Sequence, residues 1–244
     1  MRLERIATER GAILYDPARL DHPTSVDFDA AALAAAGRVT GAATGRGSAW
    51  FVAAARPGAG ATVLRHYRRG GWISRLVADR YLWCGEEATR AFRELRLLAT
   101  IEVLGLPAAR PVAACYARIG ALYRADLLTL EIPHARPLAT RLAGGLAAPV
   151  WRRIGATIRE FHDAGVRHAD LNARNVLLDA ADAVHLIDFD RGALAAPGSW
   201  REGNLERLRR SLLKLGGGAP ASADPRGWTE LVAGYRAPRS APPR

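Results

Sequence analysis

The first half of the chain alternates apolar and polar residues in a way that predicts strands. Two such runs, Trp50 to Ala55 and Thr62 to Tyr67, flank a turn rich in glycine and proline, which predicts a hairpin. From Glu86 to Ala99, apolar residues recur at helical spacing, and this pattern predicts a helix with Glu94 at the edge of its buried stripe. Two further strands are expected, over Ala113 to Arg118 and Leu122 to Ile132.

The pattern becomes more helical after Pro133. Pro149 suits the first turn of a helix that ends before Gly165. The short apolar runs Val176 to Leu178 and Val184 to Ile187 predict a small hairpin. A last helix is expected to carry four leucines on one stripe: Leu205, Leu208, Leu212 and Leu215. Charged, turn-rich residues 1–26 and the Gly/Pro/Ala/Ser-rich stretches 216–227 and 237–244 predict loosely held ends.

Composition narrows the class of protein. With 244 residues, 49% hydrophobic and 24% charged, the chain is expected to form one globular domain with a substantial core. The excess of basic residues is arginine, because Lys214 is the only lysine, so a Walker-type phosphate loop and a pyridoxal Schiff base have no credible lysine. Cys84 and Cys115 lie far apart, which indicates neither a disulfide framework nor a zinc site.

The strongest chemical signal is a loop that runs from His168 to Asn175, followed after a hairpin-sized gap by Asp188-Phe189-Asp190. Phosphoryl transfer requires a carboxylate that accepts the proton of the attacking hydroxyl and oxygen ligands for Mg²⁺. Asp170, Asn175 and Asp188 supply that set. If these were only turn residues that satisfy backbone donors, neither their spacing nor their order would be explained.

These motifs resemble the catalytic loop H-R-D-L-x-x-x-N and the D-F-G segment of the protein-kinase superfamily. The resemblance implies an α+β, two-lobed fold: an N-terminal antiparallel sheet lobe with one main helix, over 27–132, and a mainly helical C-terminal lobe, over 133–244. It also implies that Asp170 is the catalytic base, that Asn175 and Asp188 bind magnesium, and that His168 packs the loop. Two departures, Ala169 and Asp190, stand where the motifs have arginine and glycine.

A glycine-rich segment upstream resembles the kinase loop that covers the phosphates of ATP. Gly45 and Gly47 stand at its first two glycines, and Trp50 replaces the third. Arg65 stands where kinases have the phosphate-binding lysine, and its permanent charge suits it to bind phosphate oxygens. A solvated strand arginine is the alternative interpretation of Arg65.

The resemblance implies two further residues of the nucleotide-binding site. The helix glutamate Glu94 would be the partner of Arg65, and Glu131 would lie in the hinge beside the adenine of ATP.

Five segments narrow the resemblance to the 3-deoxy-D-manno-octulosonic acid (Kdo) kinases of the lipopolysaccharide kinase family. They are LRHYRRGG from Leu64, DRYLW from Asp79, TRAFRE from Thr89, YRADL from Tyr123 and IDFDRG from Ile187. The match runs from about Gly45 to Leu215 and implies transfer of phosphate from ATP to the 4-hydroxyl of a Kdo sugar on a lipid A precursor. It places the protein on the cytoplasmic face of the bacterial inner membrane, as a peripheral protein.

The net charge of +11 agrees with such a partner, because the Kdo carboxylate, the lipid A phosphates and the membrane surface are all anionic. Arg68 and Arg69 are candidates for binding the acceptor, against the alternative of a solvated basic face. Neither an obligate protein partner nor nucleic acid is expected, since no recognition motif accompanies the charge.

Two other functions stay open. A phosphotransferase for aminoglycosides or choline would have the same residues for binding the nucleotide as a Kdo kinase. A non-catalytic kinase-like binding module is suggested by the missing lysine and third glycine, although the presence of Asp170, Asn175 and Asp188 together favours catalysis.

Overall fold

A computed structural model describes residues 2–43, 48–54, 58–68, 79–215 and 225–237. The chain forms two compact units. The first comprises Met1–Val103 and Ala109–Glu131, and the second comprises Leu104–Ala108 and Ile132–Arg244. Among the residues described, no helix combines the length and the apolar character needed to span a bilayer.

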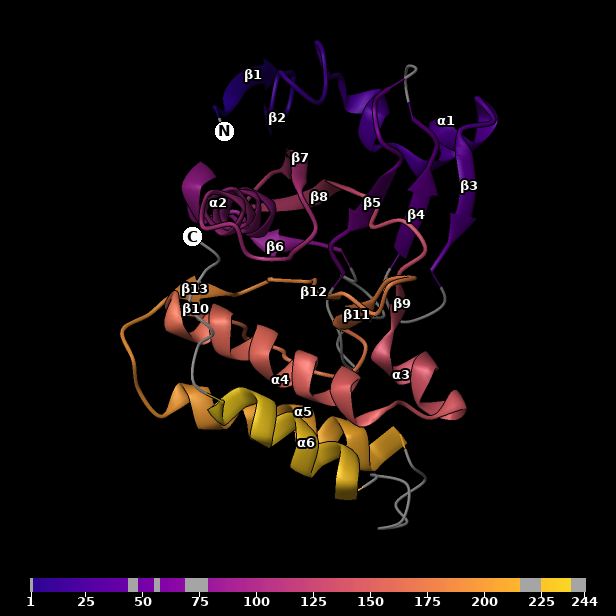
Figure 1. Ribbon diagram of the computed structural model, residues 1–244. Helices are drawn as coiled ribbons and strands as arrows, with labels where there is room; N and C mark the ends of the chain where they lie inside the picture. The colour runs from indigo at the N-terminus through magenta and orange to yellow at the C-terminus, as the bar shows by residue number, and fades with distance from the viewer. Residues whose placement is uncertain (1, 44–47, 55–57, 69–78, 216–224, 238–244) are drawn as a thin grey trace. The chain divides into compact units, whose positions relative to one another are not determined.

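The first unit is built on one antiparallel sheet (Figure 1). Its strands run in the spatial order β1-β2-β7-β8-β5-β4-β3, and β6 pairs with β8. The strands are β1 (Glu4–Thr8), β2 (Gly11–Tyr15), β3 (Val39–Ala42), β4 (Ser48–Val52), β5 (Thr62–His66), β6 (Tyr81–Leu82), β7 (Pro111–Ile119) and β8 (Leu122–Leu130). The hairpin of β4 with β5 and the pair of β7 with β8 confirm the sequence predictions.

The two faces of this sheet are covered by different helices. On one face, Cys115 and Leu64 pack with Phe28 and with Leu33 of helix α1 (Ala30–Ala35). Tyr116, the next residue along β7, points to the opposite face, where its ring centroid lies 5.3 Å from that of Phe92 in helix α2 (Arg90–Val103). The sheet therefore lies between α1 and α2.

Two expectations for the secondary structure of this unit are wrong. The segment 1–26 was expected to be loosely held, but within it β1 pairs with β2, β2 pairs with β7, and the side chains of Ile13 and Leu14 are buried. The helix expected from Glu86 starts at Arg90, since Glu86–Ala88 form a separate 3₁₀ turn that ends at the buried Thr89.

The second unit is mainly helical, with short strand pairs between its helices. Its helices are α3 (Leu138–Arg141), α4 (Ala148–Asp163), α5 (Trp200–Leu215) and α6 (Pro225–Arg236). Strands β9 (Arg136–Pro137), β11 (Val176–Leu178) and β12 (Val184–Leu186) form one small sheet, and β10 (Val166–Arg167) pairs with β13 (Ala193–Leu194). The β11–β12 hairpin and the start of α4 at its proline confirm the predictions.

Helix α5 was expected to be the last helix, and this is wrong because α6 follows it and packs along α4 (Figure 1). Two glycines permit the close approach of α4 and α6. A Cβ on Gly155 would lie 1.9 Å from the carbonyl oxygen of Leu231, and a Cβ on Gly234 would lie 2.0 Å from that of Arg152. Any larger residue at either position would push the two helices apart.

Candidate active site

In the first unit, Arg65 on β5 forms an ion pair with Glu94 of α2. Arg65 Nη2 also donates to the Tyr67 hydroxyl at 3.0 Å, and that hydroxyl donates to Glu94 Oε2 at 2.6 Å. The guanidinium carbon lies 4.6 Å from the centroid of the Tyr67 ring, which adds a cation–π contact. Three contacts therefore fix the position of the Arg65 cation.

The ion pair lies largely out of water, since only 2% of the Glu94 side chain and 22% of the Arg65 side chain are exposed. Glu94 sits inside the buried stripe of α2, beside Ala91 and Leu95, and not at its edge as expected. Burial raises the pKa of Tyr67 well above its ordinary value, and the Glu94 carboxylate acts in the same direction. The tyrosine therefore stays protonated as a donor to Glu94.

The sequence predicted five further site residues in this unit. Gly45, Gly47 and Arg69 lie outside the described residues. Arg68 is exposed at the end of the segment that follows β5. Glu131 is the last residue of the unit, just beyond β8, and its backbone N–H donates to the Ala61 carbonyl oxygen at 2.8 Å.

In the second unit, His168 anchors the predicted catalytic loop. Its Nδ1 accepts a hydrogen bond from the Asp170 N–H at 3.1 Å, so the ring proton is on Nε2, which donates to the Ile187 carbonyl oxygen at 2.8 Å. Burial lowers the pKa of His168, which keeps the ring neutral. The prediction that His168 packs the loop is confirmed.

Two asparagine side chains hold the backbone carbonyl group of Asp170. Asn172 and Asn175 both donate through Nδ2 to the Asp170 carbonyl oxygen, each at 2.9 Å. Because Asn175 uses its amide nitrogen in this bond, its Oδ1 is the atom suited to ligate a cation. The carboxylate of Asp170 remains more than half exposed, at 54%. Such a carboxylate is accessible to a substrate hydroxyl.

The β11–β12 hairpin places Asp188 beside Asn175. Asn175 precedes β11, and the N–H of Ile187, which follows β12, donates to the Asn175 carbonyl oxygen at 3.0 Å. Asp188 then adopts a left-handed backbone with φ of +64°, a conformation that non-glycine residues seldom adopt and that clusters at functional sites. The next residue, Phe189, is fully buried, with its ring 4.7 Å from His168 and 5.6 Å from Phe161.

Asn175 and Asp188 are the side chains that could hold a metal. Within the described part of the chain, no three His, Cys, Asp or Glu side chains are grouped as a metal site. An amide oxygen and a carboxylate on adjacent backbone segments nevertheless fit Mg²⁺, which binds few protein ligands and completes its shell with water and phosphate oxygens.

Helix α5 holds the catalytic loop through three residues that sequence reasoning missed. Asn204 Nδ2 donates to the His168 carbonyl oxygen at 2.8 Å, and Ser211 Oγ accepts from the Ala173 N–H at 3.1 Å. Between them, Arg207 Nη1 donates to Asp170 Oδ1 at 2.7 Å. The sequence offered one signal, since these residues share a stripe of α5 at spacings of three and four.

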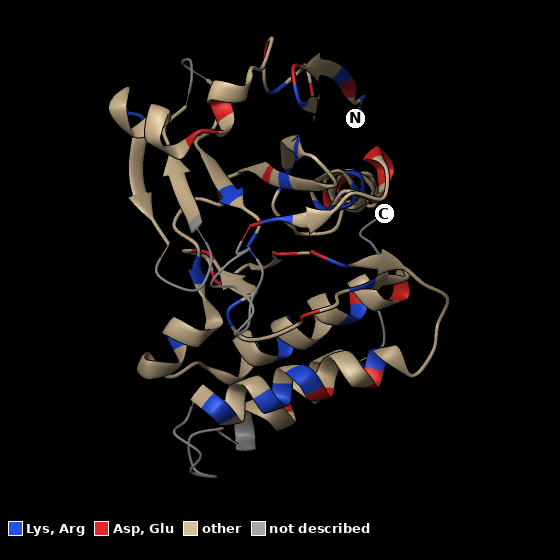
Figure 2. Cartoon of the chain, turned by 180° about the vertical axis from the view of Figure 1, so that it is seen from behind, with Lys and Arg blue, Asp and Glu red and all other residues tan. Residues whose placement is uncertain are grey.

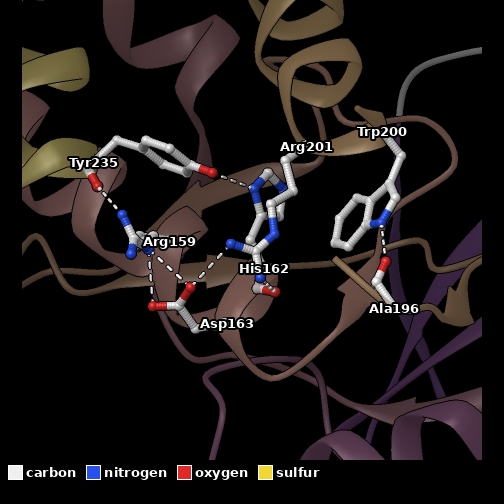
Figure 3. A network of polar contacts seen from close by, with 7 residues as sticks. All are labelled: Arg159, His162, Asp163, Ala196, Trp200, Arg201 and Tyr235. Atoms are coloured by element: carbon white, nitrogen blue, oxygen red, sulfur yellow. Dashed lines mark hydrogen bonds and ion pairs between the residues drawn. The ribbon is translucent and has the colours of Figure 1, made fainter. Parts of the chain in front are cut away.

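A polar network joins the ends of α4, α5 and α6 (Figure 3). His162 Nδ1 lies 2.9 Å from the Tyr235 hydroxyl, and Arg201 Nη2 donates to the His162 carbonyl oxygen at 2.7 Å. Asp163 accepts hydrogen bonds from both Arg159 and Arg201. Burial lowers the pKa of His162 to about 4, so its ring is neutral at neutral pH.

Comparison with known proteins identifies the family. The sequence model of the lipopolysaccharide kinase (Kdo/WaaP) family matches residues 30–235. This chain belongs to the lipopolysaccharide kinase (Kdo/WaaP) family.

Relatives in three organisms share one name, 3-deoxy-D-manno-octulosonic acid kinase. A relative in Xylella fastidiosa is 48% identical over 192 residues, which cover 78% of this chain and 76% of the relative. A relative in Stenotrophomonas maltophilia is 47% identical, with 85% and 82% covered. A relative in Photobacterium profundum is 40% identical, with 97% and 99% covered.

Membership of the lipopolysaccharide kinase family confirms the resemblance seen in the sequence and the α+β, kinase-like fold. A kinase family implies the use of ATP. The family does not favour the two alternatives, a soluble small-molecule phosphotransferase and a non-catalytic module. The structure confirms that Arg65 pairs with Glu94, whereas the catalytic and binding roles of the site residues stay predictions.

Proposed function

We propose that this protein transfers the γ-phosphate of ATP to the 4-hydroxyl of a Kdo sugar on a lipid A precursor, in the biosynthesis of the lipopolysaccharide core. The observation that carries the proposal is the catalytic loop, where Asp170 is exposed between anchored residues and Asn175 lies beside Asp188. The relatives named 3-deoxy-D-manno-octulosonic acid kinase support Kdo as the acceptor.

In this proposal, Asp170 orients the sugar hydroxyl and accepts its proton. The hydroxyl oxygen forms a bond to the γ-phosphorus, the bond from that phosphorus to the bridging β,γ-oxygen breaks, and ADP leaves with the electron pair. The hydrogen bonds to the Asp170 backbone hold its carboxylate in place before substrate binds, so catalysis relies mainly on positioning and electrostatics.

Asn175 and Asp188 would hold Mg²⁺, which when bound neutralises charge on the phosphates of ATP. Arg65 binds phosphate oxygens, and Glu94 and Tyr67 keep its guanidinium oriented for that purpose. An arginine can replace the usual lysine here because its charge is permanent and its planar fork matches two phosphate oxygens.

The protein is further proposed to work at the cytoplasmic face of the inner membrane as a peripheral protein. A lipid-linked acceptor and a net charge of +11 support this location. Sedimentation with vesicles tests it: binding to vesicles that contain phosphatidylglycerol, lost at high salt, is expected. Equal binding to neutral vesicles would contradict the electrostatic basis.

The proposed reaction is tested by incubating the protein with ATP and Mg²⁺ and offering a Kdo-bearing lipid A precursor, a panel of aminoglycosides, or choline. Transfer to the lipid alone, with the new phosphate located on the Kdo 4-hydroxyl by NMR, is the expected result. Transfer to a soluble acceptor only would keep the kinase chemistry and overturn the acceptor. Binding of ATP without transfer to any acceptor would favour the non-catalytic module.

A further inference from the structure

The stripe of α5 that contacts the catalytic loop contains one residue whose contact differs from the others. Asn204 and Ser211 bond to backbone groups of the loop, which makes them anchors for its conformation. Arg207 instead bonds to the carboxylate of Asp170, the group proposed to meet the acceptor hydroxyl. Arg207, between the two anchors, therefore lies next to the group that would react with the acceptor.

Arg207 is also more exposed to solvent than the anchor Asn204. Asn204 is only 7% exposed, whereas the side chain of Arg207 is 49% exposed and that of Asp170 is 54% exposed. An ion pair this open to water contributes little to stability. A guanidinium in such a place is accessible to a solute that approaches Asp170.

Arg207 has donors for two anions at once. Its bond to Asp170 uses Nη1, and a guanidinium has five N–H donors arranged as a planar fork. The fork matches a carboxylate in geometry as well as in charge. Arg207 can thus bind Asp170 and a second carboxylate together, holding the second one within a few ångströms of the base.

Its surroundings keep this part of the helix basic. Basic residues recur along α5, as Figure 2 shows, and the nearby Glu206 pairs with Arg209, with the two charged groups 3.6 Å apart. Arg207 itself forms its ion pair with the carboxylate of Asp170. Helix α5 contains five basic residues and two acidic ones, so an incoming carboxylate would meet net positive charge along this helix.

We propose that Arg207 binds the carboxylate of the acceptor sugar and so selects a sugar acid over a neutral sugar at this site. The inference rests on the proposed function and deepens it, because a carboxylate held by Arg207 orients a hydroxyl of the same ring toward Asp170. It assigns acceptor recognition to α5, in addition to Arg68 and Arg69, which the sequence indicated.

The test compares two substitutions, Arg207→Gln and Arg207→Lys, with Arg209→Gln as a matched control on the same helix. The acceptors are a Kdo-bearing lipid A precursor, its carboxamide, and its dephosphorylated form. Arg207→Gln is expected to raise the KM for the unmodified acceptor on the order of 10- to 100-fold, the value of a charge-assisted contact, while kcat and the KM for ATP change little. Arg207→Lys should be intermediate, and Arg209→Gln should resemble the wild type.

The carboxamide identifies the ligand. With it, the wild type and Arg207→Gln should have the same KM, because the anion that Arg207 binds has been removed. With the dephosphorylated acceptor, Arg207→Gln should still raise the KM by the full 10- to 100-fold. If the penalty disappears there instead, Arg207 binds a phosphate and the carboxylate assignment is overturned.

Two other results would also overturn the inference. A fall in kcat with an unchanged acceptor KM would mean that Arg207 only positions Asp170. A penalty that is equal on the acid and on the carboxamide would mean the same. Failure of the wild type to phosphorylate any Kdo-bearing acceptor is a different result, which overturns the proposed function together with this inference.

Discussion

His162 is expected to make the stability of the protein depend on pH between pH 4 and 6.5. The ring is 1% exposed, and burial lowers its pKa from 6.5 to about 4. Arg201 also lowers this pKa, whereas the Asn204 side chain and Asp163 oppose the change. Below pH 6.5 the unfolded chain binds more protons than the folded protein, so the free energy of unfolding falls as the pH falls.

The size of the effect follows from the two pKa values. Each pKa unit corresponds to about 1.4 kcal/mol, so the neutral His162 contributes about 3.5 kcal/mol. That contribution is present in full above pH 6.5, decreases through the interval, and is lost below pH 4. Other groups titrate in the same range, so the effect has to be isolated by comparison with a variant.

The contribution of His162 to the free energy of unfolding is isolated by urea unfolding of the wild type and of His162→Asn at pH 7.5 and pH 4.5. Asparagine does not titrate, so the stability advantage of the wild type over the variant should shrink by about 2.5 kcal/mol between these pH values. His22→Asn is the control, because the His22 side chain is 90% exposed and its loss should change stability by less than about 0.5 kcal/mol. A wild-type advantage that stays constant between the two pH values would refute the reasoning.

Three other predictions concern the site and the fold. Glu94→Gln removes the charge that orients the Arg65 guanidinium. In steady-state kinetics, the KM for ATP should therefore rise on the order of tenfold, and the KM for the acceptor should not change. Asp188→Ala should abolish transfer and leave the circular dichroism spectrum unchanged; retained activity would contradict its role as metal ligand. Gly155→Ala would place a Cβ 1.9 Å from a backbone oxygen and should lower the free energy of unfolding by about 2 to 3 kcal/mol. Gly203→Ala in α5, with open space around it, should raise that free energy by about 0.5 to 1 kcal/mol, so equal effects of the two substitutions would contradict the packing argument.

The catalytic loop was predictable because its geometry is local. The loop from His168 to Asn175 and the β11–β12 hairpin are close in sequence, so the spacing that indicates the chemistry also determines which residues meet. The pairing of Arg65 with Glu94 was predictable only through the resemblance to kinases, because β5 and α2 are separate elements. The burial of Glu94 was underestimated, since a charge on a helix stripe does not reveal the partner that makes burial tolerable.

Other features depend on contacts between distant segments. The strand β2 is short, and its membership of the sheet becomes evident only from its pairing with β7, far along the chain. Helix α6 follows a Gly- and Pro-rich stretch, and its packing depends on the two glycines at the α4–α6 contact. The contact of Arg207 with Asp170 joins residues 37 positions apart on different elements, so the stripe on α5 indicates a contact face but does not identify the loop that it meets.

Asp170 is proposed to be the base for phosphate transfer to a Kdo sugar. The most direct measurement is single-turnover transfer of labelled phosphate from ATP to a Kdo-bearing lipid A precursor, by the wild type and by Asp170→Asn, with ATP binding measured for both. We expect transfer by the wild type and a rate lower by at least about a thousandfold in the variant, with ATP binding unchanged. Transfer at a comparable rate by the variant would show that Asp170 is not the base.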